Sequence, residues 1–410
     1  MVNLADETTT RLRRRWRIAG LLSLASALNY LDRQTLSVMA GTMQAELGMS
    51  DVDYSYVTSA FLFSYTAMYV VSGRLVDRFG TRRGFAWSVG GWSLATMGHA
   101  LVQTAGQLAG VRFVLGVFES ANFPAGIRAV TEWFPVRERA LAVGIFNAGA
   151  SVGSAVAVPL ISVLALHFGW RSAFVVTGAL GLVWLLVWQR WYHLPRADGD
   201  GGEAVPQPTV PLLALLRRPE LWACVAARVL IDPVTYFLNF WIPKYLQTEQ
   251  GFDLKTLGFA AWIPYAALAV GAIAGGSLPA ALIRRGWSLH RARMAVMAGA
   301  SALIPLAYGL LSGTASPIGA VACIAALMFL HGSWSNITLP TELFSRSVQG
   351  TVTGLGGTLG GLAGMGTQLL IGYTVQQGSY TPVFVAAGLA YAVAFLLVRG
   401  LAGRLGREVV

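Results

Sequence analysis

The sequence predicts an all-α polytopic membrane protein with twelve transmembrane helices in two halves of six. Of its 410 residues, 55% are hydrophobic and only 12% are charged, against roughly 25% charged residues in an ordinary soluble protein. The apolar runs reach the roughly 20 residues that a membrane-spanning helix needs. Arginines gather in alternate connections between these runs, as they do on the cytoplasmic side of a membrane.

Twelve apolar runs are separated by charged breaks or by breaks that contain glycine and proline. They lack the residue-by-residue alternation of a membrane β-barrel, so we expect helices. The predicted helices cover residues 17–42, 54–75, 84–103, 106–130, 138–165, 171–192, 221–247, 256–282, 290–312, 316–339, 348–376 and 380–402.

The longest polar stretch, 195–219, contains the run ADGDGGEAVPQPTVP and has the composition of a linker. It divides the chain into a first half, 1–194, and a second half, 220–410. Two six-helix halves are typical of duplicated transporters, in which the substrate site lies between the halves.

The arginine-rich segments precede the first helix and follow the second, fourth, sixth, eighth and tenth. This pattern places both termini in the cytoplasm. The first apolar run contains Asp32 and Arg33 and is followed by no small-residue cleavage site, so we interpret it as a retained helix rather than a signal peptide.

The net charge of +11 is spread over these connections, so it indicates topology and gives no reason to expect nucleic acid. Cys224 and Cys323 both lie in apolar runs and predict neither a disulfide nor a metal site. We expect a monomer in the lipid bilayer.

Three groups of ionisable residues fall inside the predicted spans. Each such residue costs about 2.5–3.5 kcal/mol in the bilayer, so it should face a partner or a polar space. In the first helix, the spacing of Asn29, Asp32 and Arg33 predicts one polar face. In the fourth helix, Arg112 and Glu119 lie two turns apart on one face.

The third group is Arg228 and Asp232, an i,i+4 pair just before Pro233, which predicts a kink at that level. Each group has a structural alternative, an ion pair that only holds helices together, and for Arg228 and Asp232 the two interpretations stay open. For the first two groups we favour function. An anion bound to a buried arginine would release its carboxyl partner to take up a proton, which is a chemical basis for symport.

Glycines recur every three or four residues in the eleventh predicted helix, which predicts close helix contact. These are Gly350, Gly354, Gly357, Gly361 and Gly364.

The connection between the second and third predicted helices resembles the signature loop of the major facilitator superfamily. The matching residues, which the resemblance implies form a gating loop, are Gly73, Asp77, Arg78, Gly80, Arg82 and Arg83. The corresponding segment of the second half, 276–293, keeps its arginines but has Pro279, Ala280 and Ala281 where an acid is expected.

Within that superfamily, the runs NYLDRQTLSV, LIDPVTYFLNFWIPKYL and LIRRGWSLHRAR resemble the anion:cation symporter family and its bacterial hexuronate transporters. The resemblance implies proton-driven uptake of a sugar acid such as glucuronate or galacturonate across a bacterial inner membrane, with twelve helices and no cofactor. It makes Asp32 and Glu119 the proton-linked acids, Arg33 the partner of the substrate carboxylate, and Arg112 a residue that tunes Glu119. The expected sugar contacts are Tyr30, Tyr65, Tyr236, Asn239, Trp334 and Asn336. Arg228 and Asp232 match the hexuronate-type members.

Other function classes fit less well. Efflux of lipophilic cations would favour acids without arginines, and a phosphate-ester exchanger has less need of Asp32 and Glu119. Gly149-Ala-Ser151-Val-Gly153 fits the G-x-S-x-G pattern of hydrolases but lies inside an apolar run, so we do not expect an enzyme. An aldonate, an aromatic acid or a non-transporting sensor role stays open.

Overall fold

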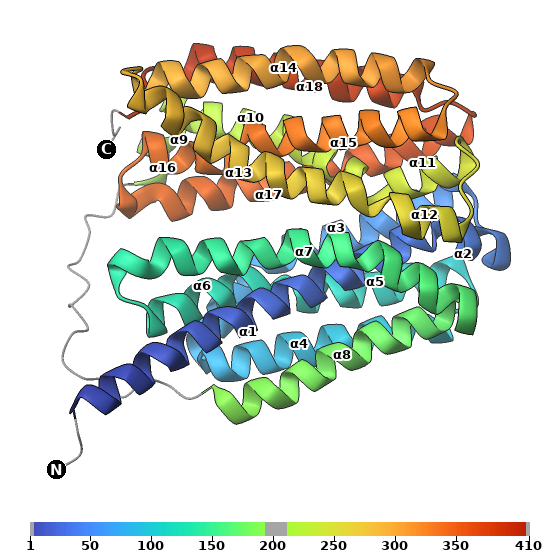
Figure 1. Ribbon diagram of the computed structural model, residues 1–410, viewed down its shortest axis with the longest axis horizontal. Coiled ribbons are helices and arrows are strands. Elements are labelled where there is room, and N and C mark those ends of the chain that lie inside the picture. Colours follow the sequence, from blue (N-terminus) through green and yellow to red (C-terminus); the bar gives the residue numbers. More distant parts are fainter. Residues whose placement is uncertain (1–3, 193–210, 407–410) are drawn as a thin grey trace.

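The computed structural model describes residues 4–192 and 211–406, and within these ranges every regular element is a helix (Figure 1). The all-helical content confirms the predicted all-α class. The long helices run along the long axis of the molecule. Most of the predicted linker, 195–210, lies outside the described residues. The division of the chain at 195–219 therefore stays a prediction.

The helices before the linker lie together in the lower part of Figure 1. They are α1 (Leu4–Val38), α2 (Ala40–Leu47), α3 (Asp51–Phe79), α4 (Thr81–Gly98), the 3₁₀ turn η1 (His99–Leu101), α5 (Ala105–Glu119), α6 (Asn122–Trp133), α7 (Val136–Phe168) and α8 (Trp170–Trp191).

The helices after the linker lie together in the upper part of Figure 1. They are α9 (Leu212–Leu216), α10 (Pro219–Phe240), α11 (Ile242–Thr248), α12 (Leu254–Ala260), α13 (Trp262–Arg284), α14 (Leu289–Gly313), α15 (Pro317–Trp334), the 3₁₀ turn η2 (Asn336–Thr338), α16 (Leu339–Leu343), α17 (Arg346–Gln376) and α18 (Thr381–Leu401).

Several predicted helices are divided in the structure, and proline explains four of the divisions. Proline has no backbone N–H and fits the first turn of a helix, where that donor is not needed. Pro124, Pro243, Pro264 and Pro340 each lie within the first three residues of the segment that follows a break. The prediction of one continuous helix is therefore wrong for four ranges, 106–130, 221–247, 256–282 and 316–339, each of which is divided in the structure. Pro233, in contrast, lies inside α10, which continues through it.

Seven stretches among the described residues are long and apolar enough to cross a membrane, namely α7, α8, α10, α12 with α13, α14, α15 with α16, and α18. Helices α1, α3, α4, α5 and α17 lie alongside them in the bundle (Figure 1). These five carry the charged, hydroxyl or glycine residues that lower their hydropathy. Together the long helices make up the twelve-helix bundle of the major facilitator fold.

Within each group, helices distant in sequence pack together. Helix α1 packs on α7, α3 on α5, and α4 on α8, whereas α10 packs on α17 and α18, and α13 on α15. Between the groups, α3 contacts α17 and α7 contacts α13. Helix α1 begins and α18 ends at the same end of the bundle, which we call the terminal end; the opposite end is the distal end (Figure 1).

Candidate functional site

An ion pair between α1 and α5 is the centre of the candidate site. Arg33 Nε lies 2.6 Å from Glu119 Oε2, and the side chain of Glu119 is fully buried whereas that of Arg33 is 14% exposed. Aromatic rings surround the guanidinium, whose Cζ lies 4.7 Å from the ring centroid of Tyr65, 5.0 Å from that of Tyr30 and 5.1 Å from that of Phe61. Such contacts add favourable cation–π energy.

The contact of Glu119 with Arg33 differs from the pairing that the sequence suggested. Arg112 and Glu119 are two turns apart, about 10 Å along the helix axis, which is too far for a direct ion pair. In the structure, buried Arg112 instead directs Nη2 to within 3.5 Å of the Arg33 carbonyl oxygen, and its Nε and Nη1 have no hydrogen-bond partner among the described residues.

Asp32 points to different helices from its neighbour Arg33, because consecutive helical residues are turned by about 100°. Its carboxylate is buried, and Thr96 in α4 and Thr177 in α8 lie beside it. Neither carboxylate oxygen has a hydrogen bond of normal geometry to any described residue. Asp32 and Arg33 therefore have different neighbours within the first group of helices, and their shared polar face stays a prediction.

Helix α10 contributes the second-half charge pair. Arg228 Nε lies 3.0 Å from Asp232 Oδ2, and their side chains are 27% and 10% exposed. Tyr236 lies one turn further along α10. The adjacent Gly360 and Gly361 of α17 make room for Asp232 and for Thr66 of α3, so the pair lies near the part of α3 whose Tyr65 ring faces Arg33.

Glycines of α17 make room for this pair. A Cβ atom at Gly360 would lie 2.3 Å from Asp232 Oδ2, and one at Gly364 would lie 2.3 Å from Tyr236 Cδ2. A Cβ at Gly361 would lie 2.3 Å from Thr66 Oγ1 in α3. The predicted close helix contact is found at these positions, whereas Gly350 and Gly354 face open space.

The other predicted sugar contacts have different surroundings. Asn239 accepts a hydrogen bond from Gln34 Nε2 in α1 at 3.0 Å, so it joins the two groups of helices. Trp334 is fully buried, and its indole N–H donates to Ser301 Oγ at 2.8 Å within the second group. Asn336 lies in η2, and its Nδ2 has no hydrogen-bond partner among the described residues. Their contact with substrate stays a prediction.

A third region, at the terminal end, holds the gating-loop residues. Asp77 Oδ1 accepts a hydrogen bond from Arg128 Nη1 at 2.8 Å, and Arg128 Nε donates to Glu132 Oε1 at 2.9 Å. Gly73 packs near Pro124, and Gly80 has a φ of 81°, which favours glycine. Arg78 lies over the Phe79 ring, Arg82 donates to the Gln189 carbonyl oxygen, and Arg83 is exposed.

Sequence reasoning missed Arg128 and Glu132, although their i,i+4 spacing was a visible signal. It also missed the acid of the second half, which comes from a later segment. Arg293 pairs there with Glu342, Nε to Oε1 2.9 Å, and also donates to the Ser335 carbonyl oxygen. Glu132 and Glu342 both follow a threonine and precede an aromatic residue by two positions, in Thr-Glu-Trp-Phe and Thr-Glu-Leu-Phe.

The distal end is joined by polar contacts across the two groups of helices. Lys244 of α11, buried, forms an ion pair with Asp51 at the start of α3, and we call this pair the distal latch. Gln247 Nε2 donates to the Val38 carbonyl oxygen at 2.9 Å, and Tyr54 donates to the Phe240 carbonyl oxygen at 2.8 Å. Sequence reasoning did not select Lys244 or Asp51 as site residues.

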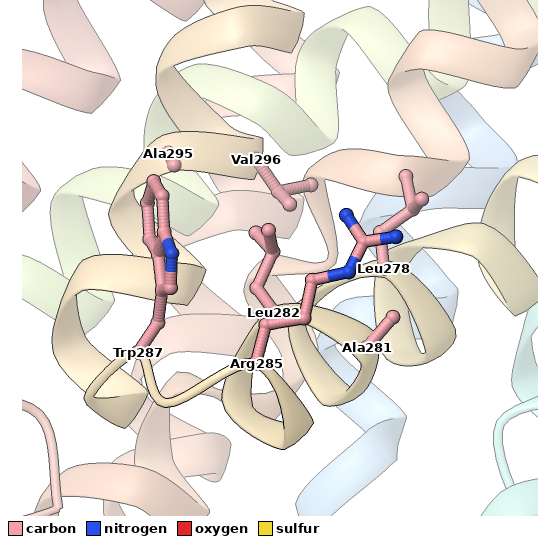
Figure 2. Close-up of a pocket in the computed structure, with 7 residues that line it drawn as sticks. All are labelled: Leu278, Ala281, Leu282, Arg285, Trp287, Ala295 and Val296. Atoms are coloured by element: carbon pink, nitrogen blue, oxygen red, sulfur yellow. The ribbon is translucent and has the colours of Figure 1, made fainter.

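A surface groove of about 440 Å³ lies elsewhere, between the terminal ends of α13 and α14. Figure 2 shows Arg285 and Trp287 beside Leu278, Leu282 and Val296. This groove is lined mainly by apolar side chains, and none of its lining residues belongs to the Arg33–Glu119 or Arg228–Asp232 pair. We therefore do not assign it to substrate. Among the described residues, no group of three or more His, Cys, Asp or Glu side chains could hold a metal ion.

A bundle of apolar helices that keeps arginines and carboxylates on its inner faces defines a polytopic membrane transporter. The sequence model of the Major Facilitator Superfamily matches residues 22–367, and the chain belongs to that superfamily. Proteins of this superfamily are transporters rather than enzymes.

Curated relatives extend over most of the chain. It is 32% identical to the hexuronate transporter of Escherichia coli strain K12 over 390 residues, which cover 90% of each chain. It is 34% identical to the galacturonate transporter of Dickeya chrysanthemi over 330 residues, 76% of this chain and 95% of that one. The crystal structure of a D-xylose-proton symporter superposes with a TM-score of 0.79 at 13% identity, covering 96% of this chain and 99% of that one.

Proposed function

We propose that this transporter carries a sugar-acid anion, of the hexuronate class, together with a proton into the cell by alternating access. The observation that carries the proposal is the buried Arg33–Glu119 ion pair, held among tyrosines that are partly exposed. Arginine presents a planar fork that matches a carboxylate, and tyrosine hydroxyls suit the hydroxyl groups of a sugar. The similarity to the hexuronate and galacturonate transporters supports this substrate class.

Coupling follows from the burial of Glu119. When the substrate carboxylate binds Arg33, it takes the position of the Glu119 carboxylate. Glu119 is then a buried anion without its partner, a state that costs several kcal/mol. Taking up a proton removes this cost, so substrate and proton bind together. Asp32, which has no hydrogen-bonded partner among the described residues, is the second proton-linked acid in this proposal. Arg112, whose Nη2 lies 3.5 Å from the Arg33 carbonyl oxygen, tunes Glu119.

The orientation in the membrane is part of the proposal. The arginine-rich connections favour a cytoplasmic position for both termini in a bacterial inner membrane, and in this orientation the terminal end faces the cytoplasm and the distal end faces outward. The polar contacts at the distal end then close the path to the outside. We propose that the protein works as a monomer.

A ligand-induced melting screen tests the substrate class, because a bound ligand stabilises the folded protein. The purified transporter is heated with hexuronates, aldonates and aromatic acids, each at the same concentration. We expect the largest rise in melting temperature with glucuronate or galacturonate. A rise with aldonates or aromatic acids alone would assign the site to those anions, and no rise with any acid would contradict transport of this class.

A further inference from the structure

The pair formed by Arg228 and Asp232 differs from the Arg33–Glu119 pair, because the charge of its arginine is already balanced within one turn of one helix. Arg228 Nε contacts Asp232 Oδ2 at 3.0 Å. Among the described residues, the only polar contact of the Arg228 guanidinium is the one that its Nε makes with Asp232, and its side chain is 27% exposed. The guanidinium therefore keeps free donors while its charge is neutralised.

Helix α17 fixes where these free groups lie. Gly356, Gly357 and Gly360 leave the space in which Arg228 and Asp232 pack, with a Cβ at Gly356 only 3.1 Å from Arg228 Cγ and one at Gly357 3.4 Å from Arg228 Nη2. Gly360, which makes room for Asp232, is followed by Gly361, which makes room for Thr66 of α3, and the ring centroid of the adjacent Tyr65 lies 4.7 Å from Arg33 Cζ. A ligand bound by its carboxylate at Arg33 and extending past Tyr65 would therefore reach Arg228 with its other end.

The charges decide what that other end can be. A carboxylate arriving at Arg33 replaces Glu119, which lies on a different helix and is relieved by a proton. A second carboxylate that approaches Arg228 would be repelled by the negative charge of Asp232. Asp232 stays beside the arginine because both residues lie on the same helix, one turn apart. Binding sites commonly discriminate between ligands by placing a like charge where the wrong ligand carries its own charge. Neutral hydroxyl groups meet no such repulsion and can use the free donors of Arg228.

We propose, on the basis of the proposed function, that Arg228 and Asp232 form a selectivity filter that binds the uncharged end of a sugar monoacid and excludes sugar diacids. Arg228 donates hydrogen bonds to hydroxyl or ring oxygens, and Asp232 repels a second carboxylate. Asp232 is thus a specificity-determining residue rather than a member of the proton-coupling group.

Glucuronate and glucarate are suitable probes because they share one carbon skeleton and differ at C1, which closes the sugar ring in glucuronate and is a second carboxylate in open-chain glucarate; the ratio of their affinities is therefore compared between variants. Equilibrium dissociation constants are measured for both with the purified full chain, in wild type, Asp232→Asn and Glu249→Gln. The last variant removes a carboxylate from an exposed distal connection and controls for net charge. Size-exclusion profiles show whether each variant is folded, and Asp232→Ser replaces the asparagine variant if it is not.

We expect wild type and Glu249→Gln to prefer glucuronate, and Asp232→Asn to shift the ratio of the two dissociation constants toward glucarate by about tenfold or more. An unchanged ratio in folded Asp232→Asn would overturn the filter, as would equal binding of both acids by wild type. Binding of neither acid by wild type would instead refute the proposed function, and the filter with it.

Discussion

The two arginine–carboxylate pairs use the same chemical groups but differ in how they are held. Arg33 and Glu119 come from α1 and α5 and are 86 positions apart in the chain, whereas Arg228 and Asp232 are one turn apart on α10. Each pair joins a buried acid to a more exposed arginine: the side-chain exposures are 0% for Glu119 and 14% for Arg33, and 10% for Asp232 and 27% for Arg228. The first pair can separate when a helix moves or a ligand intervenes, and the second cannot separate far.

This difference indicates how one transporter can assign proton coupling and substrate selection to different ion pairs. A pair between helices suits an exchange of partners, in which the substrate replaces Glu119 and the acid takes a proton. A pair within one helix suits a fixed pattern of charge that a substrate must match. Predictions that separate the two tasks follow, in order of decreasing expected effect.

The largest effect is expected from Arg33→Ala. It removes the proposed carboxylate partner and leaves Glu119 as an unpaired buried acid, and truncating one partner of a buried charge pair costs about 2–5 kcal/mol. Isothermal titration calorimetry of this variant with glucuronate should show no detectable binding. Arg33→Lys keeps the charge and should bind weakly, while Arg285→Ala, in the groove of Figure 2, should bind normally. Normal binding by Arg33→Ala would remove Arg33 from the site.

Glu119→Gln should separate transport from coupling. Glutamine keeps the shape of the side chain but cannot exchange a proton, so accumulation driven by a pH gradient should disappear. Exchange of labelled for unlabelled substrate needs no net proton movement and should persist in proteoliposomes. Glu249→Gln is the matched control and should retain both activities. Loss of exchange together with accumulation would show that Glu119 is needed for substrate binding itself.

Gly360→Ala should affect the second pair through packing alone. The added methyl group would lie 2.3 Å from Asp232 Oδ2 and 3.1 Å from the Arg228 carbonyl oxygen. Overpacking of this kind costs about 1–3 kcal/mol, which a lowered melting temperature would report. Gly366→Ala lies on the same helix with nothing within 4 Å of its new Cβ and should melt as wild type does. Equal melting of the two variants would contradict the tight contact of α10 with α17.

The smallest effect is expected at the distal latch. Lys244→Met removes the cation that pairs with Asp51, so the distal end should open more often, by a factor on the order of ten in population. Spin labels at positions 103 and 249, in a background without Cys224 and Cys323, report this opening as longer distances. Lys255→Met, an exposed lysine near the same end, should leave the distances unchanged. Unchanged distances in Lys244→Met would show that other contacts close this end.

The helical architecture could be predicted because it depends on local properties, namely the length of apolar runs and the arginines between them. The helix breaks near Pro124, Pro243, Pro264 and Pro340 were less visible. Proline is compatible both with the first turn of a new helix and with the interior of an existing one, as Pro159, Pro233, Pro279 and Pro305 show. The sequence alone does not distinguish these two positions.

The candidate site was predictable in its members but not in its contacts. Asp32, Arg33, Arg112 and Glu119 stand out because charge is rare in apolar runs. Which acid meets which arginine depends on how helices pack, so spacing along α5 suggested Arg112 for Glu119, whereas the structure has Arg33. Arg228 with Asp232 was the exception, since an i,i+4 pair is fixed by helix geometry alone. The distal latch joins two helices far apart in sequence and left no local signal.

Uptake of labelled glucuronate into proteoliposomes with an imposed pH gradient tests the central claim most directly. Wild type should accumulate the acid above its external concentration when the outside is acidic, and an ionophore that collapses the gradient should return it to equilibrium. Accumulation that is indifferent to the gradient, with counterflow of glucuronate fully retained, would contradict proton coupling through the Arg33–Glu119 pair.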